Sequence, residues 1–165
     1  MFKSFTGNQR KKMKKYYYSY DEFLQDVNVL INRCKSYDCD VILGISRGGL
    51  TISHFMGEAL NIRNVFTVNS IHYDGMRKLE TFNIFNVPNL INASKVLIVD
   101  DIVDSGETMV EVFKILQEKY PMCEFKLASL FYKKTAQLQP DFTVKEAPTW
   151  IDFFWEADLK RIRAV

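Results

Sequence analysis

The segment from Val96 to Thr108, VLIVDDIVDSGET, constrains the fold more than any other part of the chain. Its apolar start is rich in β-branched residues, as expected of a strand covered on both faces. Three carboxylates follow (Asp100, Asp101 and Asp104), and a small polar turn then leads into an apolar helical pattern. A buried strand followed by a helix predicts a parallel sheet in an α/β fold. Ligands of such sheets bind beyond the carboxyl ends of the strands, so this turn is a candidate site.

The rest of the chain alternates between strand and helix patterns, as an α/β fold requires. Ser19 and Glu22 form a capping-box signature, and an apolar stripe of helical spacing follows them as far as Cys34. A second helix is predicted from about Leu50 to Leu60. Short buried strands are predicted at 40–45, 65–68, 95–99 and 125–131. The length of 165 residues suits one domain.

Two segments fall outside this alternation. Residues 71–94 show only weak hydrophobic periodicity. The segment is longer than a loop that merely connects two elements usually is, so we predict an active-site flap there. Six basic residues crowd the start, which predicts a solvated, disordered N-terminal tail over residues 1–18. They are Lys3, Arg10, Lys11, Lys12, Lys14 and Lys15.

Composition and charge limit the partners of the chain. A net charge of +2 is too small to indicate nucleic acid, and no stretch is apolar for long enough to span a bilayer. The start lacks the apolar core of a secretory signal. The three cysteines match no zinc spacing, which indicates free thiols in a reducing compartment. We therefore expect a cytoplasmic protein with no nucleic acid partner and no membrane span.

The turn at 104–108 suits an anion that lies beside a sugar. Backbone N–H groups at a helix start attract anions, and Gly106 would let the backbone approach a phosphate closely. Asp100 and Asp101 are out of place in a site for phosphate alone. They fit a ligand that also offers ribose hydroxyls, or a hydrated Mg²⁺ ion held through one or two carboxylates. The sequence thus predicts a sugar phosphate bound together with Mg²⁺.

A second glycine-rich loop, GISRGGLT at 44–51, comes close to an ATP-binding P-loop. Leu50 occupies the position of the phosphate-binding lysine of a P-loop, so we exclude ATP hydrolysis. What remains is a turn that could hold pyrophosphate through backbone amides and the guanidinium of Arg47.

With both loops in view, the chain resembles the type I phosphoribosyltransferase family. VLIVDDIVDSGET is similar to its signature for phosphoribosyl pyrophosphate, and the chain looks most like bacterial xanthine–guanine (6-oxopurine) members. SRGGL at 46–50 resembles their pyrophosphate loop, and Tyr73 followed by Asp74 resembles the start of their flap. The resemblance implies a twisted, parallel-type sheet flanked by helices, in a single domain over 19–156. That domain would carry a mobile flap at about 71–94 and a small C-terminal hood at about 132–156, leaving 157–165 as a tail.

The resemblance also implies an activity: transfer of phosphoribose to guanine, xanthine or hypoxanthine in purine salvage, with release of pyrophosphate. Asp104 would be the general acid/base, and Asp101 would lie near Mg²⁺. Lys133 would read the 6-oxo group, Trp150 would stack on the base and Ile151 would offer it a backbone carbonyl. The residues that would bind phosphoribosyl pyrophosphate are Ser46, Arg47, Gly48, Gly49, Tyr73, Asp100, Asp101, Asp104, Ser105, Gly106, Glu107 and Thr108. Members of the family are typically dimers or tetramers, so a homodimer or homotetramer is expected.

Two alternatives remain open. The basic N-terminus would suit a non-catalytic regulator of the same fold that binds nucleotide or RNA. A second alternative is an enzyme for another base, such as adenine or orotate, although Lys133 as a donor to a 6-oxo group argues against adenine. The chain also departs from the family in having His72 before Tyr73, where a small serine is common.

Overall fold

The computed structural model describes residues 15–73 and 81–163, without the side chains at 72, 73, 81 and 82. A six-stranded sheet forms the centre, in the order β4-β3-β2-β5-β6-β7. All neighbouring strands are parallel except β3 and β4, which are antiparallel. The strands are β2 (Val41–Ser46), β3 (Val65–Tyr73), β4 (Thr81–Phe85), β5 (Lys95–Val103), β6 (Glu124–Tyr132) and β7 (Phe142–Glu146). The predicted α/β class with a parallel-type sheet is confirmed.

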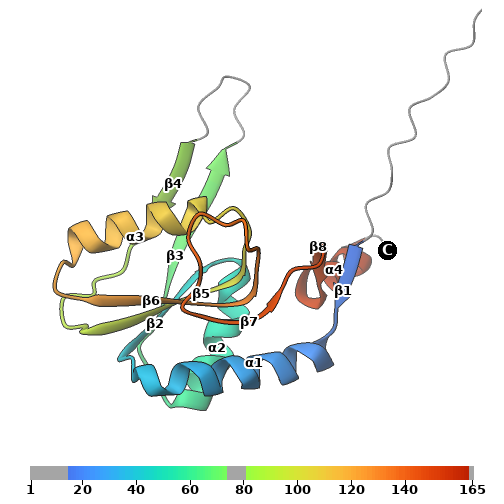
Figure 1. The fold of residues 1–165 in the computed structure, drawn as a ribbon, viewed down its shortest axis with the longest axis horizontal. Coiled ribbons are helices and arrows are strands. Elements are labelled where there is room, and N and C mark those ends of the chain that lie inside the picture. Colours follow the sequence, from blue (N-terminus) through green and yellow to red (C-terminus); the bar gives the residue numbers. More distant parts are fainter. Residues whose placement is uncertain (1–14, 74–80, 164–165) are drawn as a thin grey trace, which may run out of the picture.

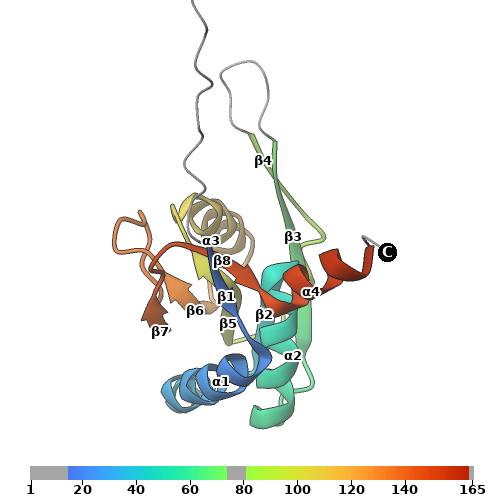
Figure 2. The ribbon, with the colours of Figure 1, turned by 90° about the vertical axis from the view of Figure 1, so that its right-hand side faces the viewer.

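Three helices cover the two faces of this sheet (Figures 1 and 2). Helices α1 (Tyr20–Cys34) and α2 (Gly48–Leu60) pack on one face, and α3 (Glu107–Lys119) packs on the other. A short 3-10 turn, η1 (Lys35–Tyr37), follows α1. The side chains of β5 alternate between two apolar clusters: Leu97 and Val99 join α1 and α2, whereas Val96 and Ile98 join α3. This double burial explains why the strand reads as a continuous apolar run.

The predicted capping box is present at the start of α1. The Ser19 hydroxyl accepts a hydrogen bond from the Glu22 N–H, and the Glu22 carboxylate accepts one from the Ser19 N–H. Phe23 is fully buried, as the apolar stripe predicts. Tyr20 and Leu24, which belong to the same stripe, are 48% and 39% exposed, because they lie at its margin.

Two strands are longer than their sequence patterns predict. β5 continues to Val103, so Asp100 and Asp101 lie within the strand and not after its end. β3 continues to Tyr73 and pairs with β4, so the described parts of the predicted flap at 71–94 include the two arms of a hairpin. These arms extend past the neighbouring strands (Figure 1). Residues 74–80, where the flap would be centred, lie outside the described residues.

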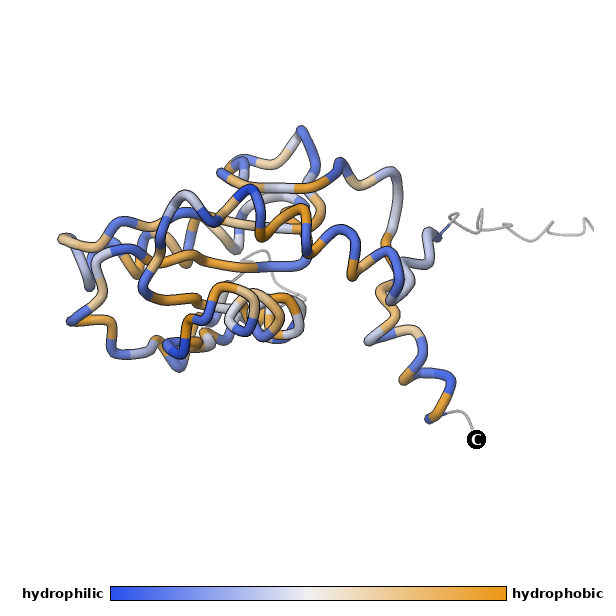
Figure 3. Tube along the Cα trace, turned by 90° about the horizontal axis from the view of Figure 1, so that it is seen from below, coloured by the Kyte–Doolittle hydropathy of each residue, from blue (hydrophilic) through white to orange (hydrophobic). Residues whose placement is uncertain are grey.

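Both ends of the chain differ from their predicted tails. Residues 15–18 form strand β1 (Lys15–Tyr18), which pairs in parallel with β8 (Trp150–Phe153) in a small separate sheet. Helix α4 (Phe154–Arg163) occupies most of the predicted tail at 157–165 and extends away from the body (Figure 3). The basic run concealed β1, because it leads directly into an aromatic segment whose last residue, Tyr18, is fully buried. The rest of the predicted N-terminal tail, residues 1–14, lies outside the described residues.

Among the helices of the described residues, none is long and apolar enough to cross a membrane.

Candidate active site

The two loops identified from the sequence lie against each other at the ends of adjacent strands. β2 and β5 are neighbours in the sheet, so the loops that follow them meet at one edge. A side chain at Gly48 would overlap the Asp101 carboxylate, and one at Gly49 would overlap the Val99 carbonyl. The chain needs glycine at both positions for this close approach. We call residues 46–49 and 100–108 together the acidic edge.

The first loop of the acidic edge offers an anion site at a helix start. Arg47 is the N-cap of α2, and no side chain caps that end of the helix. The Arg47 side chain is exposed, and the Ser46–Arg47 peptide bond is cis. A helix start with uncapped amides and a guanidinium beside it is suited to bind phosphate groups.

The second loop begins at two crowded carboxylates. Asp100 and Asp101 are half-buried, and the Asp100 carboxylate accepts a hydrogen bond from the Asp101 N–H at 2.9 Å. Burial and the adjacent Asp101 raise the pKa of Asp100 well above its usual range. Burial, with a smaller contribution from the charge of Glu156, raises the pKa of Asp101. Two crowded carboxylates of this kind attract hydroxyl donors or a divalent cation.

The turn from Asp104 to Thr108 leads into α3. Gly106 is the N-cap and has a φ of 82°, a conformation that other residues adopt at a cost. The Ser105 hydroxyl accepts a hydrogen bond from the Glu107 N–H at 3.3 Å, while Asp104 is exposed to solvent. The turn thus presents backbone amides, hydroxyls and the Asp104 carboxylate on the same short segment.

A cavity of about 200 Å³ opens beside the acidic edge. We call it the hood cavity; its lining residues are Asp101, Ile102, Asp104, Lys133, Thr149, Trp150, Ile151, Phe153 and Glu156. Drug-sized ligands usually occupy pockets of about 300–1,000 Å³, so this volume suits a smaller, flat molecule. All three residues predicted to bind a purine line this cavity, together with the predicted general acid/base.

The walls of the hood cavity differ in character. Trp150 is 56% exposed, which leaves a face of its ring available for stacking, while Ile151 is buried. The Lys133 ammonium contacts the Asp104 carboxylate at 2.5 Å. Lys134, the next residue along the chain, instead pairs with Glu146 at 2.7 Å. The structure therefore distinguishes the two lysines by the surfaces they face.

Most predicted site residues are brought together. The residues from both loops form the acidic edge, and Lys133, Trp150 and Ile151 adjoin it through the hood cavity. The side chain of Tyr73 lies outside the described residues. The sequence reading missed Ile102, Thr149, Phe153 and Glu156 as lining residues. Their nearness to Asp101, Trp150 and Ile151 in the sequence is the one signal that could have indicated them.

Comparison with known proteins agrees with this geometry. Residues 8–161 match the family model described as "Phosphoribosyl transferase domain". The chain belongs to this family. The fold and the family expected from the sequence are thus confirmed, and the protein is an enzyme of the phosphoribosyltransferase class.

Individual relatives cover nearly the whole chain. A xanthine-guanine phosphoribosyltransferase of Cereibacter sphaeroides is 27% identical over 90% of this chain and 91% of its own length. That of Idiomarina loihiensis is 32% identical over 73% of each chain. Among solved structures, the xanthine-guanine-hypoxanthine phosphoribosyltransferase of Helicobacter pylori has a TM-score of 0.85 and 37% identity, covering 92% of this chain and 100% of that one. A purine phosphoribosyltransferase from Pyrococcus horikoshii has a TM-score of 0.75 and 28% identity, covering 86% of this chain and 93% of that one.

Proposed function

We propose that this phosphoribosyltransferase joins a 6-oxopurine base (guanine, xanthine or hypoxanthine) to phosphoribosyl pyrophosphate. The products are the nucleoside 5'-monophosphate and pyrophosphate. The observation that carries the proposal is the hood cavity, where Lys133, Trp150 and Asp104 meet beside the acidic edge. The names of the relatives above, which include xanthine, guanine and hypoxanthine, support the same class of base.

The site is divided between the two substrates. The acidic edge would hold phosphoribosyl pyrophosphate, with the 5'-phosphate on the turn at 104–108 and pyrophosphate at the start of α2. The ribose hydroxyls would donate to Asp100 and Asp101. The base would lie in the hood cavity, stacked on Trp150. This arrangement directs an imidazole nitrogen of the base toward the anomeric carbon of the sugar.

In the reaction, a bond forms between that nitrogen and the anomeric carbon while the bond to pyrophosphate breaks. Asp104 would hold the proton of the purine imidazole ring, as a general acid/base. Lys133 would donate to the 6-oxo group, which lies on the same edge of the purine as one of its imidazole nitrogens. The 2.5 Å contact between Lys133 and Asp104 brings both groups to one end of the cavity, as reading that edge requires.

The acidic edge has a donor set that fits Mg²⁺. Asp100 and Asp101 supply two crowded carboxylates, whose pKa values are raised mainly by burial and then by neighbouring acidic groups. Magnesium is usually held through one or two carboxylates together with substrate phosphates. When bound, Mg²⁺ would neutralise negative charge on the departing pyrophosphate.

We further propose that the protein works in the cytoplasm as a homodimer or homotetramer. All three cysteines are free thiols, as is usual in a reducing compartment. Leu50 and Val65 are 40% and 38% exposed beside a groove between α2 and β3, which is also lined by Glu58 and Arg63. In a twofold arrangement, Glu58 of one copy can meet Arg63 of the other. Light scattering should report a dimer or larger assembly, and Leu50→Glu should shift it toward monomer.

The first test is an activity assay with purified protein, phosphoribosyl pyrophosphate and Mg²⁺. Each purine base is offered in turn, and nucleotide formation is followed by chromatography. Turnover of a 6-oxopurine that is lost in Asp104→Ala would support the proposal and rank the bases. Nucleotide binding without turnover of any base would overturn it in favour of a non-catalytic regulator.

A further inference from the structure

The strand that carries the predicted base-stacking residue does not belong to the central sheet. Trp150 begins β8, and the strand partner of β8 among the described residues is β1, from the start of the chain. The register places Lys15 opposite Trp150 and Tyr18 opposite Phe153. The position of the hood cavity wall therefore depends on where β1 is fixed.

Tyr18 anchors β1 through its ring. The residue is fully buried, and its ring meets Phe131 edge-on at 4.9 Å and Phe153 edge-on at 5.7 Å between centroids. Phe131 lies in β6, two residues before Lys133, and Phe153 ends β8. The ring thus stands between the strand that leads to Lys133 and the strand that carries Trp150. Edge-to-face contacts of this kind hold aromatic pairs at a defined angle.

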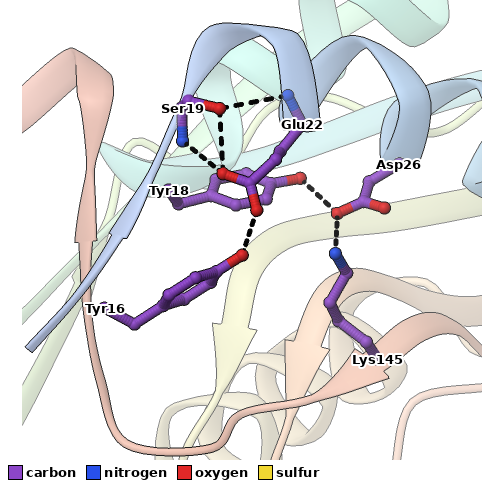
Figure 4. A network of polar contacts seen from close by, with 6 residues as sticks. All are labelled: Tyr16, Tyr18, Ser19, Glu22, Asp26 and Lys145. Atoms are coloured by element: carbon purple, nitrogen blue, oxygen red, sulfur yellow. Dashed lines mark hydrogen bonds and ion pairs between the residues drawn. The ribbon is translucent and has the colours of Figure 1, made fainter.

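The hydroxyl of Tyr18 fixes the same residue to the body of the enzyme (Figure 4). It donates a 2.7 Å hydrogen bond to Asp26 of α1, which is only 8% exposed. The Asp26 carboxylate also contacts the Lys145 ammonium of β7 at 2.7 Å. The ammonium lies 5.7 Å from the ring centroids of both Tyr18 and Phe131. Hydrogen bonds to a charged partner are stronger than neutral ones and have stricter geometry.

The turn between β1 and α1 is fixed in a similar way. Glu22, the carboxylate of the capping box, also accepts a hydrogen bond from the Tyr16 hydroxyl. Tyr16 lies opposite Ile151 in the β1–β8 register. Contacts with the first turn of α1 therefore fix the direction of β1, the strand that leads into this helix.

We infer that Tyr18 is a positioning residue for the purine: through Asp26 and the β1–β8 pairing it fixes Trp150 and Ile151 relative to Lys133. The inference rests on the proposed function only in naming a purine as the occupant of the hood cavity. Tyr18 touches neither substrate, so its effect is on the affinity for the base and not on the chemical step.

The test compares Tyr18→Phe with a matched variant, Tyr37→Phe. Tyr37 belongs to the same apolar cluster, and its hydroxyl donates to the Glu124 carbonyl at 3.0 Å, remote from the hood cavity. Tyr18→Phe should raise the KM for the base about three- to tenfold, with kcat and the KM for phosphoribosyl pyrophosphate changed less than twofold. Tyr37→Phe should leave all three unchanged. A base KM of Tyr18→Phe within twofold of that of Tyr37→Phe overturns the inference.

A double variant tests whether the effect passes through Trp150. If it does, Tyr18→Phe should raise the base KM of Trp150→Ala less than twofold, since the stacking ring is already gone. Effects that multiply in full would show that Tyr18 acts by another route, contrary to the inference.

Hydrogen exchange separates failure of this inference from failure of the proposed function. Amides of residues 150–153 should exchange faster in Tyr18→Phe than in Tyr37→Phe, while those of β2 and β5 match. A wild-type enzyme that converts no 6-oxopurine would overturn the proposed function, yet the exchange comparison would still decide whether Tyr18 fixes β8. Equal exchange at 150–153 in the two variants would overturn the positioning role.

Discussion

The acidic edge and the hood cavity are assembled in different ways. Each half of the acidic edge is one strand, its following turn and the start of a helix, so its residues are close neighbours in the sequence. The hood cavity joins Asp104, Lys133 and β8, and β8 is in turn held by β1, from the opposite end of the chain. We therefore expect the two regions to have different roles. The acidic edge, built from local segments, would carry the chemistry, and the hood cavity, built by long-range packing, would provide affinity for the base. Substitutions in the two regions should therefore alter different kinetic constants.

The largest effect is expected at Asp104. Asp104→Ala removes the proposed general acid/base, and such groups contribute about 10²–10⁴-fold to rate, so kcat should fall by that factor. Because Asp104 is exposed, the melting temperature should change little. Steady-state kinetics with saturating substrates measure the change. A kcat within threefold of wild type would remove Asp104 from the chemistry.

Lys133 and Lys134 allow a comparison between a lysine that lines the hood cavity and its neighbour in the chain, which does not. Lys133→Ala should lower kcat/KM for a 6-oxopurine about 10- to 100-fold, the usual effect of losing a charged hydrogen bond of about 1.5–3 kcal/mol. Lys134→Ala, its matched control, should stay within twofold, because Lys134 pairs with Glu146 on an exposed surface. Equal losses in both variants would contradict a specific role for Lys133.

Trp150 should affect the base and leave the sugar diphosphate alone. Stacking of an aromatic side chain on a base contributes about 1–3 kcal/mol, so Trp150→Ala should raise the base KM at least fivefold. The KM for phosphoribosyl pyrophosphate should not change, because we propose that this substrate binds at the acidic edge. Trp150→Phe, which keeps a smaller ring, should show an intermediate value. A rise in both KM values would show that the two regions are not independent.

The smallest effect is on stability and concerns Asp101. Burial, with the charge of Glu156, raises the pKa of Asp101 to about 6 from an ordinary 3.8. Because its pKa is raised in the folded state, the Asp101 carboxyl favours the folded state when it is protonated and disfavours it when it is ionised. The favourable contribution is fully present below the unfolded pKa of about 4. That contribution is lost as the pH rises through about 6. Asp101→Asn, which stays neutral, should therefore melt about 2–8 °C higher than wild type at pH 8 and nearly together with it at pH 4.

Thermal melts without substrate or Mg²⁺ measure this difference, and the variant should at the same time lose activity. Bound Mg²⁺ and phosphoribosyl pyrophosphate should reduce the gap, since they bind wild type and stabilise its charged carboxylates. A lower melting temperature of Asp101→Asn at pH 8 would contradict the conclusion that burial of the Asp101 carboxylate destabilises the fold at this pH.

The second loop of the acidic edge was predictable because its signals are local. An apolar β-branched run, clustered carboxylates and a glycine turn before a helix each have a direct structural meaning, and they lie within 13 residues, Val96 to Thr108. Even so, the strand boundary was placed four residues early, at Val99 instead of Val103. Acidic residues usually end a strand, but here pairing with β6 continues past them, with Ile102 opposite Phe131 and Val103 opposite Tyr132.

The N-terminal segment shows where local reading fails. Lys15 to Tyr18 lies at the end of a dense basic run. The composition of that run is typical of a solvated tail. The burial of Tyr18 comes from Phe131 and Phe153, more than 100 residues away in the chain, which no local pattern around Tyr18 can indicate. Helix α4 was missed for a different reason: its amphipathic pattern is short and follows directly on β8.

The sequence by itself determined the α/β class, the family and the residues of the two loops that form the acidic edge, because these depend on side-chain chemistry and on short-range backbone preferences. Only the tertiary structure decided which lysine faces the hood cavity, that Glu156 lines it and that Tyr18 packs against Phe131 and Phe153. Those facts depend on contacts between segments remote in sequence. Many alternative pairings satisfy the same local patterns, and the packing of the whole domain selects one of them.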